Sequence, residues 1–187
     1  DLKQMRPDSG GLRSGNPVET RRNYKYGIQR LPLMFQALEV PVVAAVNGHA
    51  IGAGLDLATM CDVRVAAESA KFAESFVKLG IIPGDGGAWL LPRIVGFSRA
   101  TELALTGEMI DSAEALKIGL VSHVVPDVDL LAKAREIAAK IAANPPHAVR
   151  MTKRLLREGQ MADLKNILEM SAAMQSLAHN TSDNDEA

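Results

Sequence analysis

Short apolar runs divide the first two thirds of the chain into predicted strands. The clearest of them are VVAAV (42–46), DVRVAA (62–67) and LVSHVV (120–125). The first run is apolar on both faces, so we expect it to lie in a sheet that is covered on both sides. A Gly-rich bend, NGHAIGAG (47–54), and a short helix over 54–61 separate the first two runs. Strand, helix and strand in this order predict a βαβ-like unit with short connections.

Other segments carry apolar residues at three- and four-residue spacings, which predict helices. These expected helices cover 24–38, 88–96, 98–105, 112–119, 128–143, 147–158 and 161–179. Asp111 and Glu114 form a capping-box pattern at the start of the fourth helix. Residues 6–22 are rich in Pro, Gly, Ser, Asn and Arg, and predict a mobile loop, while Phe72-Ala73 predicts a further short strand.

Strand patterns cease at Pro126, and only helical patterns follow it. We therefore divide the chain into a mixed α/β core over 1–125 and a helical region over 126–187. The segment Asp1-Leu2-Lys3 has the character of a continuation rather than a beginning, so we expect the core to start earlier in a longer protein.

The amino-acid composition limits the kinds of partner and cofactor that we expect for this protein. The net charge is −1 and the pI is about 6.5, which indicates neither a nucleic-acid partner nor a membrane-surface partner. No apolar run approaches the roughly 20 residues needed to cross a bilayer, and the polar amino terminus lacks a signal-peptide pattern. Cys61 is the single cysteine, which excludes an intramolecular disulfide, and no metal-ligand pattern is present. A cytoplasmic location is the expectation.

The Gly-rich bend is the segment that most favours a ligand-binding or catalytic site. Gly48, Gly52 and Gly54 lack a Cβ, so the backbone can bend sharply and approach a ligand closely. The bend leads into a helix whose first N–H groups have no intrahelical acceptor and can bind a negative oxygen. Two alternatives stay open. The glycines could serve close packing alone, or they could bind phosphate, although the GK[ST] and GxGxxG patterns are absent.

Three longer stretches together resemble the enoyl-CoA hydratase/isomerase (crotonase) family. They are PVVAAVNGHAIGAGLDLATMCDVRVAAESAKF, LGIIPGDGGAWLLPRIVG and LTGEMIDSAEALKIGLVSHVV, and they match the family's pattern in order and spacing. The resemblance implies an α/β fold, a spiral of ββα units with a C-terminal helical trimerisation region. It implies an acyl-CoA thioester as substrate, no cofactor beyond that coenzyme A, and a homotrimer or a hexamer built as a dimer of trimers.

The resemblance also assigns an oxyanion hole to the bend. Ala53 occupies the position whose backbone N–H binds the oxygen of a thioester enolate, with Gly52 and Gly54 beside it. A preorganised donor of this kind is worth roughly 3–4 kcal/mol in the transition state. The second donor of the family would precede Asp1.

The candidate acid–base residues match the family's pattern less closely than the bend does. Asp56 stands where hydratases of the family carry the first of two catalytic glutamates, and Phe76 stands where they carry the second. Asp85, in the PGDGG loop, and Glu74 are the carboxylates that could substitute. The structural alternatives are an Asp56 that complements the helix dipole, an Asp85 that forms a turn and a Glu74 that is solvated. Since a phenyl ring cannot move a proton, Phe76 predicts weak standard hydratase activity.

Several functions remain open at this stage. The first is an acyl-CoA lyase or isomerase, most simply an enoyl-CoA hydratase, that works through an enolate; a dienoyl-CoA isomerase-like activity is the variant that Asp56 suggests. The others are a non-catalytic acyl-CoA-binding paralogue and a hydrolase on the same fold, the latter without a GxSxG nucleophile motif. In the helical region, Lys153 or Arg154 could reach coenzyme A phosphates in a trimer, although a solvated face is the simpler interpretation.

Overall fold

The computed structural model describes residues 11–181 of the chain. Its helices are α1 (Pro17–Tyr26), α2 (Arg30–Ala37), α3 (Ala53–Met60), α4 (Gly87–Val95), α5 (Phe97–Thr106), α6 (Ser112–Lys117), α7 (Leu130–Ala142), α8 (Pro146–Glu158) and α9 (Leu164–Ala178). Its strands are β1 (Val43–Val46), β2 (His49–Ile51), β3 (Val63–Ala67), β4 (Lys71–Ala73), β5 (Met109–Asp111) and β6 (His123–Val125). Two short 3₁₀ helices are η3 (Ser75–Leu79) and η4 (Asp127–Asp129).

Two three-stranded sheets are built alternately as the chain proceeds. One has the order β1-β3-β6 and is parallel throughout; the other has the order β2-β4-β5, with β2 parallel and β5 antiparallel to β4. Each of the first two turns adds one strand to each sheet before the chain enters helix: β1, β2 and α3, then β3, β4, η3 and α4. This repeat confirms the predicted spiral of ββα units.

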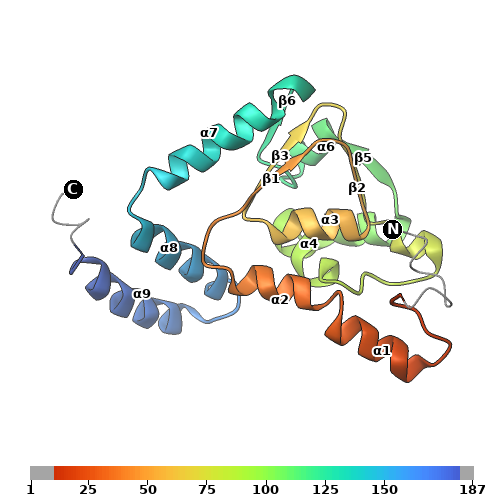
Figure 1. Ribbon diagram of the computed structural model, residues 1–187, viewed down its shortest axis with the longest axis horizontal. Helices are drawn as coiled ribbons and strands as arrows, with labels where there is room; N and C mark the ends of the chain where they lie inside the picture. The colour runs from red at the N-terminus through yellow and green to blue at the C-terminus, as the bar shows by residue number, and fades with distance from the viewer. Residues whose placement is uncertain (1–10, 182–187) are drawn as a thin grey trace.

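The alternation of side chains along β3 separates two hydrophobic clusters. Ala66 faces the larger cluster, which includes Leu55 of α3 and Leu91 of α4, while Val65 and Ala67 face the smaller one beneath α7. Helices α3 and α4 therefore cover one side of this sheet and α7 covers the other, as Figure 1 shows. The predicted 62–67 strand and the cap at Asp111, which accepts from the N–H of Glu114, are both confirmed, whereas the Glu114 side chain pairs with Arg99 and does not complete the box.

The region before β1 differs from the sequence prediction. Residues 17–22, expected in a loop, form most of α1, because Asn16 caps the helix and Pro17 occupies its first turn. The single helix expected over 24–38 is interrupted at Gly27, and α2 begins at Arg30. Pro32 is tolerated there because the first turn of a helix has no intrahelical acceptors for its N–H groups. Residues 11–16 of the predicted loop form no helix or strand, and residues 6–10 lie outside the described residues.

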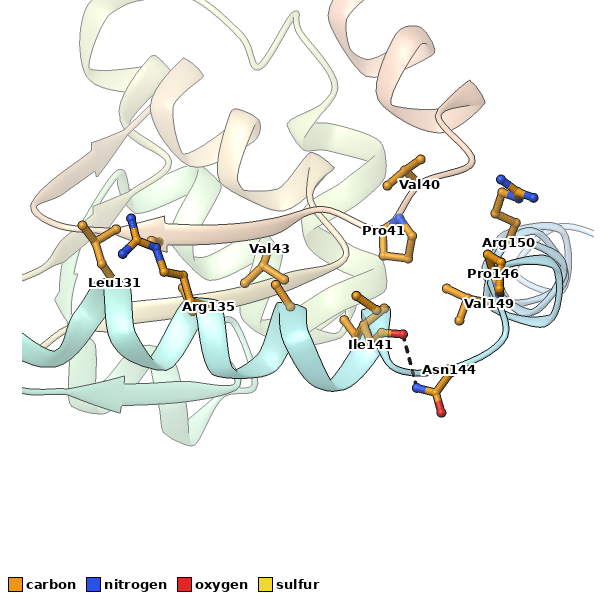
Figure 2. Close-up of a pocket in the computed structure, with 14 residues that line it drawn as sticks. Val40, Pro41, Val43, Leu131, Arg135, Ile141, Asn144, Pro146, Val149 and Arg150 are labelled. Carbon is orange, nitrogen blue, oxygen red and sulfur yellow. Dashed lines mark hydrogen bonds between the residues drawn. The ribbon is translucent and has the colours of Figure 1, made fainter. Parts of the chain in front are cut away.

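Two strands were missed, and one was expected to be more deeply buried than it is. β2 lies within the segment predicted as a bend, and β5 has no counterpart in the prediction, since three residues are too few to show a period of two. All four residues of β1 are half-buried rather than buried. The reason is that β1 is an edge strand and that a cavity of about 590 Å³ remains between β1, α7 and α8 (Figure 2).

A buried ion-pair network attaches α8 to the core. Asp62, just after α3, lies 2.8 Å from Lys153 Nζ and 2.8 Å from Arg157 Nη2. Lys153 also donates to the carbonyl of Val40, and Asp62 accepts from the N–H of Val42. The side chain of Lys153 is therefore committed to this network, and the interpretation that it reaches coenzyme A is wrong, whereas the same role for the exposed Arg154 stays a prediction.

The last helix leaves its apolar side chains uncovered. No residue of α9 is buried, and Leu164, Leu168 and Leu177 are 73%, 58% and 66% exposed. Figure 1 shows α8 and α9 at the opposite end of the molecule from α1. Beyond Val125 the described chain is helical, and α7 packs on the first sheet while α9 packs on α8.

Candidate active site

The Gly-rich bend ends in a tight turn that starts α3. Gly52 has φ 54° and ψ −120°, a left-handed conformation that a residue with a Cβ rarely adopts. Its N–H donates to the carbonyl of Ala73 at 2.8 Å, so the turn is tied to the end of β4. The local fold thus joins the beginning of α3 to the residue that precedes Glu74.

Ala53 and Gly54 form the first turn of α3 and are exposed. As the first helical residue, Ala53 has no intrahelical acceptor for its N–H. This placement at a helix amino terminus is the one that the sequence predicts. The two cavities described, of about 590 and 760 Å³, are lined by neither residue, so a cleft beside Ala53 stays a prediction.

Three carboxyl groups from separate elements converge beneath this turn. Asp56 comes from the first turn of α3, Glu74 follows β4 directly, and Asp85 lies in the loop before α4. Their exposed fractions are 0%, 1% and 5%. Among the residues that the structure describes, both oxygens of Asp56, both of Glu74 and Oδ1 of Asp85 have no hydrogen-bond donor. The solvated Glu74 considered as an alternative is therefore wrong.

Gly87 shows how closely two of these groups approach each other. A Cβ at Gly87 would lie 2.2 Å from Asp56 Oδ1 and 2.5 Å from Glu74 Oε1. One oxygen of each carboxyl group therefore lies next to the Gly87 Cα. The space between them is too small for a methyl group, so it is open only because residue 87 is a glycine. Gly87 is a site residue that sequence reasoning missed, although it ends the PGDGG motif.

Burial with few hydrogen-bond donors favours the protonated forms of these carboxyl groups. Desolvation, a side-chain hydrogen bond with Asp85 and the charges of Glu74 and Asp85 raise the pKa of Asp56 to about 10, while the backbone N–H of Gly87 opposes this shift. Desolvation and the charge of Asp85 raise the pKa of Glu74 to about 7, while a hydrogen bond from Asp56 opposes this shift. A hydrogen bond between two carboxyl groups requires a proton on one of them. Near neutral pH Asp56 therefore holds a proton that it can donate, and Glu74 is poised to accept one.

Phe76 lies outside the carboxyl cluster. It is half-buried, and its ring packs on the turn at Gly52, where a Cβ would lie 3.4 Å from ring carbons. Its position supports a role as a wall beside the start of α3. Within residues 11–181 no group of three or more His, Cys, Asp or Glu residues is arranged to hold a metal ion. In the same part of the chain, no helix combines the length and apolar character needed to span a membrane.

The fold and the site define a class of protein: an α/β spiral with buried carboxyl groups near a helix amino terminus. The family model of enoyl-CoA hydratase/isomerase matches residues 8–187. The short-chain-enoyl-CoA hydratase of Clostridium acetobutylicum is 38% identical over 182 residues, which are 96% of this chain and 69% of that protein. The crotonyl-CoA hydratase of Syntrophomonas wolfei is 41% identical over 158 residues, or 84% and 61%.

Solved structures agree with the sequence comparisons. The crystal structure of an enoyl-CoA hydratase from Bacillus anthracis has a TM-score of 0.86 and 42% identity, and covers 90% of this chain and 65% of that one. The chain belongs to the enoyl-CoA hydratase/isomerase family. It spans 41–69% of the length of eight curated relatives that it matches.

Proposed function

We propose that the protein containing this chain is an acyl-CoA lyase or isomerase, and in the first instance an enoyl-CoA hydratase that stabilises a thioester enolate. The observation that carries the proposal is the cluster of three buried carboxyl groups, most of whose oxygens lack a hydrogen-bond donor, directly below the amino terminus of α3. Strongly shifted pKa values of this kind are typical of acid–base sites. The names of the relatives support a CoA thioester as substrate.

In hydration, Glu74 acts as the general base and Asp56 as the general acid. The Glu74 carboxylate takes a proton from water, whose oxygen adds to the β carbon of the enoyl thioester while an electron pair moves to the thioester oxygen. The Ala53 N–H stabilises the resulting enolate. Asp56 then gives its proton to the α carbon, and the enolate collapses to the thioester.

The difference between the pKa values of Asp56 and Glu74 also returns both groups to their starting protonation states. After one turnover Glu74 holds a proton and Asp56 has lost one. Because the pKa of Asp56 is about 10 and that of Glu74 is about 7, the proton moves from Glu74 to Asp56 through the hydrogen bond between them. The proposal thus needs no proton from bulk solvent in each cycle.

An isomerase is the second candidate. It would use the same two groups to remove a proton from one carbon and return it to another, without adding water. Asp56 favours an isomerase, since dienoyl isomerases of the family carry an Asp at the position of Asp56. Product analysis separates the two, because only hydration adds the mass of water to the acyl group.

The first test is crotonyl-CoA hydration by the full-length protein and by its Asp85→Asn variant, followed as the loss of the enoyl thioester absorbance. Asp85 raises the pKa of both Asp56 and Glu74. Its neutralisation will therefore shift both limbs of the pH–rate profile to lower pH and slow hydration by roughly tenfold or more. Asp129→Asn, an exposed change without a side-chain cap bond, is the matched control.

Phe76→Glu decides whether the cluster replaces the family's second carboxylate. The sequence alone predicts weak hydration because of Phe76, but with the cluster in place we expect no gain in rate, because Glu74 and Asp85 already supply acid–base groups next to Asp56. A large gain would mean that the second position is empty in the wild type. Absence of wild-type activity on any enoyl-CoA would leave the non-catalytic binding protein as the better interpretation.

We also propose a trimer or a dimer of trimers, as the resemblance implies. The uncovered leucines of α9 support it, since an exposed apolar stripe of this kind marks a contact surface. Light scattering of the full-length protein is expected to give a mass of three or six subunits. Leu164→Glu combined with Leu168→Glu should lower that mass, and a monomeric wild type would contradict the proposal.

A further inference from the structure

The turn between α1 and α2 lies directly on the loop that carries Asp85. Gln29 Nε2 donates to the carbonyl of Gly84 at 2.8 Å, across 55 residues of sequence. The ring of Tyr24 lies against Gly84 so closely that a Cβ there would be 2.9 Å from Tyr24 Cε1. On the other side of Asp85, Pro32 packs on Gly86, where a Cβ would lie 3.2 Å away. The contacts of α1 and α2 therefore flank Asp85 on both sides.

Apart from its hydrogen bond with Asp56, the Asp85 side chain has little to hold it. It is buried, and its Oδ1 has no hydrogen-bond donor among residues 11–181. The residues around it, 81–86, form no helix or strand, and Gly86 has φ 122°. Gln29 makes a side-chain hydrogen bond to this loop from outside it. The position of Asp85 is thus set by the path of the loop, and Gln29 fixes that path.

We propose that Gln29 is a positioning residue, which holds the Pro83–Gly87 loop so that Asp85 meets Asp56 and Glu74. The inference rests on the proposed function, because it concerns the same carboxyl cluster. No contact between Gln29 and a reacting atom is implied. Gln29 acts through the backbone carbonyl of Gly84, and its loss lets Asp85 move away from its two partners.

This role predicts a specific pH signature. The titratable groups that face one another here are Asp56 from α3, Glu74 after β4 and Asp85 from the loop. If Asp85 withdraws, its hydrogen bond and its charge no longer favour the protonated forms of the other two. Glu74 then ionises at lower pH and Asp56 also loses its proton at lower pH. Both limbs of the pH–rate profile move in the direction that Asp85→Asn moves them.

The test compares the pH–rate profiles of Gln29→Met and Asp85→Asn in the full-length protein with crotonyl-CoA. Methionine keeps the length of the side chain and removes the donor without adding a charge. We expect a fall in kcat of about tenfold, since small displacements of an acid–base group carry losses of this size. Both limbs should shift to lower pH, and the double variant should show no further shift beyond that of Asp85→Asn.

A second variant reaches the same loop by another contact. Gly84→Ala places a Cβ against Tyr24 at a position where the glycine has no positive φ, so it should displace the loop without backbone strain and give the same shift. Gln160→Met, at an exposed position just after α8, is the matched control and should leave the profile unchanged. Variants that unfold are recognised by thermal melting, and the pH shift is read from the ones that fold.

The outcomes separate the two proposals. Asp85→Asn with an unshifted profile overturns the proposed function and this inference with it. A shifted Asp85→Asn beside an unshifted Gln29→Met overturns the inference alone. A shift in Gln29→Met that adds fully to that of Asp85→Asn also overturns it, because the two residues would then act independently.

Discussion

Asp56→Asn will make the protein more stable at neutral pH and nearly inactive. The unfolded chain ionises Asp56 at its ordinary pKa of 3.8, whereas the folded protein keeps the proton up to about pH 10. Between these values the folded state binds the extra proton, so stability falls as the pH rises. Each pH unit in this window costs up to about 1.4 kcal/mol. Asparagine has no such proton and can still donate to Asp85 and Glu74.

The gain in the free energy of unfolding should be on the order of a few kcal/mol at pH 7. Activity should fall in the opposite direction, by roughly 10²–10⁴-fold in kcat, because an amide cannot give up a proton. Glu74→Gln should show a similar loss of activity, with its stability gain confined to pH values above about 4.5. Denaturant midpoints measured from pH 5 to pH 9, beside crotonyl-CoA kinetics, check both parts.

Glu68→Gln is the matched control for these changes, because Glu68 is exposed. It should alter neither the midpoint nor kcat. An Asp56→Asn variant that is less stable than the wild type at pH 8 would show that Asp56 is ionised in the folded protein. The proposed division of acid and base between Asp56 and Glu74 would then be wrong.

Gly87→Ala is expected to have the second large effect. Its Cβ would lie 2.2 Å from Asp56 Oδ1 and 2.5 Å from Glu74 Oε1, well inside contact distance. Gly87 has no positive φ and begins α4, so alanine is otherwise acceptable to the backbone. Overpacking of this kind costs typically 1–3 kcal/mol. Moving the two carboxyl groups apart should also lower kcat about 10²-fold.

Gly15→Ala provides the comparison, since a Cβ at Gly15 meets no atom within 4 Å and its φ is not positive. That variant should match the wild type in melting temperature and in crotonyl-CoA turnover. Normal kinetics for Gly87→Ala would mean that the substrate does not use the space between Asp56 and Glu74. The acid–base site would then have to lie elsewhere on the chain.

The sequence by itself determined the repeating framework and the place of the bend. The apolar run at 62–67 and the cap at Asp111 predict elements from neighbouring residues, and both are confirmed. The Gly-rich segment predicts a turn into a helix that starts near Ala53, because positive φ at Gly52 and free N–H groups are local properties. The family resemblance likewise depends on contiguous stretches.

Tertiary structure decided which carboxyl groups meet. Asp56, Glu74 and Asp85 are far apart in sequence, and the loop that carries Asp85 is held by Gln29 from 55 residues away. The patterns left Glu74 open to a solvated role and Asp85 to a turn, and they did not single out Gly87. A carboxyl group acquires a raised pKa from what surrounds it: the scarcity of hydrogen-bond donors, the neighbouring charges and the exclusion of water. These depend on packing between distant segments, which no local pattern of residues encodes.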